Sequence, residues 1–494
     1  MMKKASRYWI ISLALSLIIW LGLPSPSYAD SQSINAQTIH VLNRLSFGPR
    51  PGDIERVKSM GINNYIQSQL RPETIRESPK LTQKMAKLTN FYLAPTEIFK
   101  KYVPLPKNGA KKLTRKEQIK TNRRIRKVLQ ESENARLLQA IFSNKQLQEV
   151  MVDFWFNHFN ISVEKGNITR LWVGTYERDA IRPYVFGNFR NLLGATAHHP
   201  AMLFYLDNWL NTAPGSKGVR GRFKGLNENY ARELMELHTI GVNGGYTQQD
   251  IVTLAKIFTG WGIQRRGGDG SGFKFEQNRH DNSDKIFLGI PIKAGGIEEG
   301  EKALDILASH PSTARYISYK LAQYFVADTP PGSLVNKLAK RFQETNGNIR
   351  DVLETLFNSP EFWQEKYYGS KFKTPYQYIV SAARATNTDK PRWGKIKRIL
   401  EQLGMKLYAC KTPDGYKNTQ EAWLNSDAMM RRISFATIIS RGQLNQGKPK
   451  RVNHQQLRAT LGNNFSAQTQ AVISSSPAGL QAALMLGSPE MMEK

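Results

Sequence analysis

The sequence contains a single cysteine, Cys410, among its 494 residues. An intrachain disulfide is therefore excluded, as are zinc or haem sites built on paired cysteines. Several catalytic motifs are missing as well, including H-E-x-x-H, G-x-S-x-G and the Walker A loop. Beyond the N-terminus, no segment is apolar enough to cross a membrane. A chain of this length can nevertheless be stabilised by burial alone, without cross-links.

Acidic residues are also scarce, with 40 Asp and Glu against 70 Lys and Arg and a formal net charge of +30. Much of the excess is local, because twelve basic residues and one acid, Glu117, lie between Lys100 and Lys127. We predict a basic helical segment over residues 100–130, in which a long helix starts near Thr114 and lies on the outside. The residues expected to contact an anionic partner are Lys111, Lys112, Arg115, Lys116, Lys120, Arg123, Arg124, Arg126 and Lys127.

The N-terminus has the three parts of a signal peptide. Lys3, Lys4 and Arg7 form a positive region, Trp9–Leu23 is apolar, and a small-x-small cleavage box ends at Ala29. The apolar run is shorter than the ~18 to 20 residues that span a bilayer. We therefore predict that residues 1–29 are cleaved and that the protein is exported to the periplasm or beyond. An uncleaved N-terminal anchor is the minor alternative.

Predicted export narrows the partners that the basic charge suggests. In the cytoplasm such a field would point to nucleic acid, but none is expected outside it. The candidates are instead an anionic envelope polymer, an anionic lipid surface or an acidic protein. The alternative is that these charges only solvate surface loops and one helix face.

Helical periodicity dominates residues 30–494 and predicts a mostly α fold, a single large multi-helix domain with C-terminal helices over 299–494. Residues 262–298 lack this helical pattern and include a glycine-rich loop at Gly267–Gly272. After it, Phe273–Glu276 alternates and Lys285–Ile292 is rich in β-branched residues. We predict that these two segments are the strands of one small β-hairpin, inserted around residues 272–292.

The segment Asn227–Trp261 is the most distinctive part of the chain. Helical spacing over Leu226–Ile240 places an apolar arc opposite a polar one, with Asn227 as N-cap and Gly241 in the positive-φ position that ends the helix. Thr247 with Asp250 should cap the next helix. The polar arc contains Glu228, Asn229, Arg232, Glu233 and Glu236.

Two interpretations of this arc remain open. Its carboxylates could bind a hard cation or divide acid and base roles. Alternatively the arc is a solvated face that Arg232 neutralises through i,i+4 pairs. His238 lies on the apolar arc, about 160° from Glu236, so a straight helix cannot offer both to one ion. It is either a core residue or a partner for another segment.

Other polar candidates are dispersed along the chain. His158 lies in an aromatic-rich helix, where both core packing and ligand binding are open. His199 precedes Pro200, and His310 precedes Pro311 in the same way, which favours a role at helix boundaries. The remaining candidates are Asp207 after that helix, and His280 with Asp281 in a loop. The alternative function is thus a metal-dependent envelope enzyme, whose divalent cation would be held by Glu233, Glu236, His238, His158 and His199.

Several segments resemble a bacterial family of exported proteins known as domain of unknown function 1800. They are FWFNHFNIS (Phe154–Ser162), HPAMLFYLDN (His199–Asn208), Asn227–Trp261, RHD (Arg279–Asp281) and TPDGYKNTQEAWL (Thr412–Leu424). The resemblance runs from about His40 to the Ser-Pro-Glu sequence near the C-terminus. It implies a mostly helical fold but no activity, because the family has no settled one.

Overall fold

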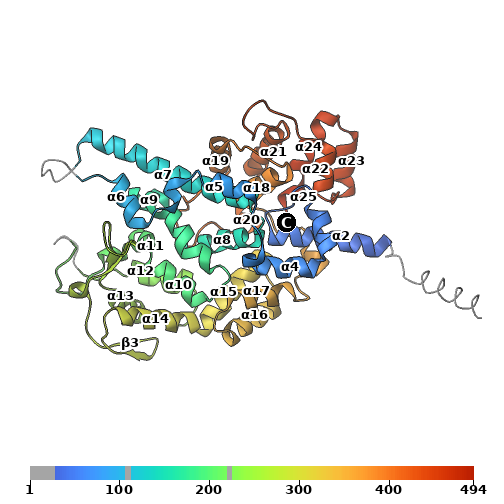
Figure 1. Ribbon diagram of the computed structural model, residues 1–494. Coiled ribbons are helices and arrows are strands. Elements are labelled where there is room, and N and C mark those ends of the chain that lie inside the picture. The colour runs from blue at the N-terminus through green and yellow to red at the C-terminus, as the bar shows by residue number, and fades with distance from the viewer. Residues whose placement is uncertain (1–27, 106–112, 220–224) are drawn as a thin grey trace, which may run out of the picture.

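The computed structural model describes residues 28–105, 113–219 and 225–494. Helices dominate this part of the chain, which confirms the predicted mostly α fold (Figure 1). The α-helices of the first half are α2 (Tyr28–Leu45), α3 (Asp53–Met60), α4 (Ile62–Leu70), α5 (Pro79–Met85), α6 (Pro95–Tyr102), α7 (Arg115–Phe142), α8 (Gln146–His158), α9 (Asn167–Thr175), α10 (Phe189–His198), α11 (Pro200–Tyr205), α12 (Asn229–Glu233) and α13 (Gln248–Ile257).

The second half of the chain is helical as well. They are α14 (Ile297–Ser309), α15 (Pro311–Phe325), α16 (Gly332–Glu344), α17 (Ile349–Phe357), α18 (Pro375–Ala385), α19 (Trp393–Gln402), α20 (Gln420–Trp423), α21 (Ser426–Ser440), α22 (His454–Thr460), α23 (Ala467–Ser475), α24 (Ala478–Leu486) and α25 (Pro489–Met492). Among the described residues, none of the helices combines the length and apolar character needed to span a bilayer. The predicted signal peptide lies outside the described residues, except for Tyr28 and Ala29 at the start of α2.

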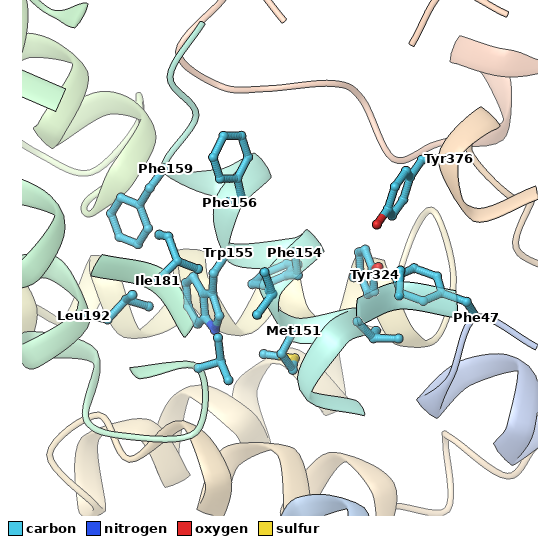
Figure 2. Close-up of a cluster of buried hydrophobic side chains, with 14 of the residues drawn as sticks. Phe47, Met151, Phe154, Trp155, Phe156, Phe159, Ile181, Leu192, Tyr324 and Tyr376 are labelled. Carbon is cyan, nitrogen blue, oxygen red and sulfur yellow. The ribbon is translucent and has the colours of Figure 1, made fainter. Parts of the chain in front are cut away.

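Helix α8 lies at the centre of the core. All of its residues are buried except Gln148 and Asn157. Figure 2 shows Phe154, Trp155 and Phe156 leaving this helix in different directions. All three belong to the buried hydrophobic core. A helix that is covered on every side can carry large apolar residues around its whole circumference. The polar groups on α8 therefore have to find partners inside the protein.

Helix α7 joins the core to the surface. It begins as predicted, because Thr114 and Glu117 form a capping box in which the Thr114 N–H donates to the Glu117 carboxylate at 2.9 Å. The first turns are largely exposed, and Figure 1 shows them reaching the edge of the molecule. The last turns, which contain Leu137 and Ile141, are buried. Lys111 and Lys112 of the predicted basic set lie outside the described residues.

The strands form two antiparallel pairs, β1 (Trp261–Ile263) with β2 (Phe273–Phe275) and β3 (Lys285–Phe287) with β4 (Ile290–Ile292). The predicted hairpin insertion is confirmed, but the predicted pairing of its strands is wrong. Segment Lys285–Ile292 folds back on itself at Leu288 and Gly289, which have φ of 50° and 77°. Positive φ at both central residues defines the tight two-residue hairpin turn. The Phe273–Phe275 strand therefore pairs upstream, where Lys274 lies opposite Gly262.

Candidate functional site

The distinctive Asn227–Trp261 segment begins with α12 and continues as a π-helical turn, η7 (Leu234–His238). Its apolar arc is buried as predicted, with Leu234 and Met235 at 1% and 0% exposure. The helical part ends at His238, a little before the predicted stop, and Gly241 has the predicted positive φ, 84°. The capping box of Thr247 and Asp250 at the start of α13 is also confirmed.

The polar arc of this segment is half-exposed and largely self-paired. Arg232 donates to Glu228 at 3.1 Å and to Glu236 at 3.4 Å, and its own side chain is 37% exposed. Glu233 has no ion pair among the described residues. Burial raises the pKa of Glu233, and the nearby charges of Glu236 and Asp414 raise it further. The arc thus presents carboxylates at the edge of the protein, where Arg232 balances part of their charge.

Asn227 and Asn229, at the start of this segment, have structural roles. Glu228, rather than Asn227, occupies the N-cap position, although the Asn227 side chain accepts a hydrogen bond from the Asn229 N–H at 3.1 Å. The Asn227 N–H donates to Asn211 at 2.9 Å, and the Asn229 amide donates to the Leu206 carbonyl at 3.1 Å. These bonds join α12 to the chain that follows α11.

His238 and His158 come together from different helices. The His158 Nε2 lies 3.0 Å from the His238 carbonyl, and the two ring centroids are 6.0 Å apart. A carbonyl only accepts, so His158 carries its proton on Nε2. Burial lowers the pKa of His158 well below its usual value and that of His238 to about 4. The backbone of Pro413 and the charge of Asp414 partly oppose the lowering at His238.

His199 and His310 have the boundary role that their prolines predicted. The His199 Nδ1 accepts from the Ala201 N–H at 3.1 Å and caps α11, and His310 caps α15 in the same way. The other His199 nitrogen lies 3.3 Å from the Thr175 hydroxyl. Burial lowers the pKa of His199 to about 3, with a further contribution from Arg178. His199 is therefore occupied at a helix start.

The remaining candidates lie in separate contacts. Asp207 adopts φ 60° and pairs with Lys165 at 2.6 Å. His280 meets the buried Glu299 at 2.9 Å, and Asp281 accepts the Ser283 N–H at 3.0 Å. Within the described ranges, no three His, Cys, Asp or Glu side chains are arranged to hold a metal ion. The five residues suggested as metal ligands are thus not gathered into one set.

A buried ion network that the sequence did not reveal surrounds α8. Arg136 of α7 donates to Asp153 at 2.6 Å and to Glu177 at 2.9 Å, and all three side chains are less than 10% exposed. Burial by itself would lower the pKa of Arg136, but Glu177, Tyr376 and Asp153 raise it well above its usual value. Arg182 extends the network by donating to Glu149 at 2.6 Å.

The network left only a weak signal in the sequence. Glu149 and Asp153 are four residues apart on α8, among apolar neighbours, so one face of a buried helix carries two acids. Such acids require cationic partners. Spacing could not identify those partners, because Arg136 and Glu177 are 41 residues apart.

A groove of about 850 Å³ lies beside the exposed half of α7. It is bounded by α7, by residues near the start of α9 and by α19. Its charged lining consists of six basic and three acidic side chains: Arg123, Arg126, Arg170, Lys397, Arg398, Lys406, Glu133, Glu164 and Glu401.

The acids of this groove are already engaged with its lysines. Lys397 pairs with Glu133 at 2.7 Å and Lys406 pairs with Glu164 at 2.9 Å. By contrast, Arg123, Arg126, Arg170 and Arg398 form no ion pair with an acid among the described residues, and of these Arg170 donates to the Val163 carbonyl at 3.1 Å. Arg124, predicted in the same set, instead donates to the Lys101 carbonyl at 2.6 Å. The uncompensated charge of the groove therefore comes from guanidinium groups, and those of Arg123, Arg126 and Arg398 form no hydrogen bond within the described residues either.

Fold and sites together define a predominantly helical protein with a buried ion network around α8 and a basic groove beside α7. Residues 40–493 match the model of the family described as "Protein of unknown function (DUF1800)", and the chain belongs to this family. This confirms the resemblance seen in the sequence motifs. No curated protein and no solved structure shows significant similarity to the chain.

Proposed function

We propose that the chain is an exported protein that binds an anionic polymer in the groove between α7 and α19. The observation that carries this proposal is the group of unpaired guanidiniums at Arg123, Arg126 and Arg398. The first two are three residues apart on one face of α7, and the third comes from α19. A bound chain would therefore meet positive charge from two helices.

The chemistry of these side chains suits repeated anionic groups. Guanidinium forms paired hydrogen bonds with carboxylate, sulfate or phosphate, and it stays charged at every physiological pH. The three acids of the groove offset only part of this charge, because six basic side chains line the groove with them, and each acid already pairs with Lys397 or Lys406.

A concave site favours a polymer over a flat lipid surface. Other exposed charges of α7, such as Arg115, Lys116 and Lys120, lie outside the lining of the groove. A bilayer would contact those protruding groups first, whereas a narrow chain can enter and meet the arginines within. The compartment of the partner follows from the predicted signal sequence at residues 1–29, which supports an envelope polymer.

The test compares two triple variants that remove the same charge. Dextran sulfate is the probe, and its affinity is measured by calorimetry for wild type, for Arg123→Glu with Arg126→Glu and Arg398→Glu, and for Arg115→Glu with Lys116→Glu and Lys120→Glu. We expect the groove variant to lose about tenfold more affinity than the control, since only it removes direct contacts. Binding should also weaken with salt, because the Debye length is about 8 Å at ~0.15 M.

Three results would count against the proposal. Equal losses in both triple variants would mean that binding follows net charge and not the groove. Binding of neutral dextran as tightly as the sulfated polymer would remove the role of charge. Tighter binding to phosphatidylglycerol vesicles, lost mainly in the control variant, would replace the polymer with a lipid surface.

A further inference from the structure

A second concave site lies beneath the loop Cys410–Thr419, apart from the groove. It is a cavity of about 270 Å³, walled by the end of α8, one face of α15 and the loop. That volume equals about nine water molecules at ~30 Å³ each, and it is close to the ~300 Å³ of the smallest ordinary ligand pockets. The cavity can therefore hold one small molecule.

His158 offers an unused hydrogen-bond acceptor to this cavity. Its ring is 3% exposed and lines the cavity wall. Because Nε2 is already donated to the His238 carbonyl at 3.0 Å, Nδ1 is the acceptor of the neutral ring. Nδ1 has no partner in the part of the chain that the structure describes. A ligand that supplies a hydroxyl or N–H donor would satisfy it.

Lys320 offers the positive charge. It lies on α15, lines the cavity and has its ammonium 6.0 Å from the Tyr316 ring centroid. No carboxylate forms an ion pair with it in the described ranges, since Asp414 is taken by Lys417 at 2.5 Å. Burial lowers the pKa of Lys320, Lys417 lowers it further, and Asp414 partly offsets this. One anionic group on a ligand would compensate this partly buried charge.

Asp414 limits the negative charge that a ligand in this cavity can carry. Asp414 also lines the cavity, and its pKa is shifted below the usual value: burial acts to raise it, but hydrogen bonds from Lys417 and Thr412 outweigh that effect. A dianion such as phosphate would face this carboxylate, whereas a single carboxylate needs only Lys320. The walls include the aromatic rings of Phe154, Tyr316 and Tyr416, which suit the apolar face of a sugar or aliphatic frame.

The covering loop is held in a fixed position. Asn157 of α8 and Tyr416 exchange two hydrogen bonds of 2.8 Å. Gly415, the residue before Tyr416, has φ 72°, and a Cβ there would overlap the Asn157 carbonyl oxygen. Only glycine tolerates both conditions. A cavity whose wall is fixed before binding does not spend ligand affinity on ordering the loop.

From these contacts we infer that the cavity beneath the Cys410–Thr419 loop binds a small hydroxycarboxylate of the uronic or aldonic acid class. The ligand carboxylate pairs with Lys320, and a ligand hydroxyl donates to Nδ1 of His158. This site is independent of the polymer groove, because the two cavities share no lining residue.

The test uses D-glucuronate and D-gluconate as probes, titrated into the full mature chain and followed by calorimetry. Lys320→Met keeps the aliphatic stem and removes the charge, and His158→Gln keeps a donor toward the His238 carbonyl while removing the Nδ1 acceptor. We expect each variant to weaken binding of the acids by about tenfold or more. Lys340→Met, on the exposed side of α16, is the matched charge control and should bind like wild type.

Further comparisons decide where the acids bind. Glucose, which lacks the carboxylate, should bind about tenfold more weakly than glucuronate. The groove variant with Arg123→Glu, Arg126→Glu and Arg398→Glu should bind glucuronate normally even though it loses dextran sulfate. The inference is overturned if wild type binds neither acid, if Lys320→Met binds them like wild type, or if the groove variant loses them. Should His158→Gln fail to fold, the Lys320→Met result alone decides.

Discussion

The polar face of α12 and η7 and the ion network around α8 contain the same chemical groups in opposite surroundings. On the first, Arg232 is 37% exposed between two glutamates of its own helix. In the second, the Arg136 side chain is 9% exposed between acids from α8 and from the π-helical turn η4 (Tyr176–Ile181). The first group is a dense run in the sequence, and the second is scattered along it.

The difference shows that density of charge along a helix does not predict burial of charge. Residues at i,i+4 spacing can neutralise one another without any help from the rest of the fold. Exposed pairs of this kind contribute about 0 to 1 kcal/mol. A charge from a distant segment is buried only where the tertiary structure supplies its partner, and removing that partner costs about 3 to 5 kcal/mol.

The largest expected effect follows from replacing the central arginine of each group. Arg136→Met leaves Asp153 and Glu177 buried without their partner and should lower the free energy of unfolding by about 3 to 5 kcal/mol. Arg232→Met should lower it by no more than ~1 kcal/mol, since its pairs are exposed. Urea unfolding of both variants measures the two costs. Equal costs would break the contrast between the regions.

The second effect compares two residues of η7, Leu234 on the buried face and Glu236 on the polar face. Leu234 is 1% exposed, so Leu234→Ala should cost about 2 to 5 kcal/mol by opening a cavity. Glu236→Gln removes only a half-exposed pair and should cost within ~0.5 kcal/mol. Thermal melts of the two single variants test this. A loss in Glu236→Gln as large as in Leu234→Ala would mean that the polar face is buried by something else.

The smallest effect separates Glu233 from its paired neighbour Glu236. Because burial raises the pKa of Glu233, the folded state favours its protonated form, and the ionised form weakens the fold slightly above that pKa. Glu233→Gln should therefore match or exceed wild-type stability at pH 7, by a few tenths of a kcal/mol. The difference should vanish below pH 4.5, the ordinary pKa of this group. Unfolding curves at both pH values check it, and destabilisation at pH 7 would contradict it.

The features that could be predicted from the sequence are those set by neighbouring residues. The Thr114 and Thr247 capping boxes, the positive φ of Gly241 and the histidine caps before Pro200 and Pro311 all depend on a few consecutive positions. The strand pairing was wrong because the two-residue turn at Leu288 and Gly289 does not have the asparagine-glycine sequence that usually marks it.

The candidate sites were only half predictable for the same reason. Arg123 and Arg126 were identified from local charge, but Arg398 joins them from a helix far along the chain. His158 was identified as a polar residue among aromatic ones, yet Lys320 and Asp414 reach the same cavity from two other segments. Sequence spacing identifies the residues that one segment contributes to each site. The residues from distant segments are known only once the fold brings them together.

The single cysteine, Cys410, lies in the loop that covers the cavity, so its reactivity reports the opening of that loop. Cys410 is 9% exposed, burial raises the pKa of its thiol, and its carbonyl accepts a hydrogen bond from Asn160 at 3.1 Å. A thiol reagent can thus modify it appreciably only when this part of the chain opens. Because no other cysteine can react, the modification rate of the native protein measures how often this loop opens. A ligand that binds in the cavity and holds the loop closed will lower the rate of Cys410 modification. A ligand that binds elsewhere will leave that rate unchanged.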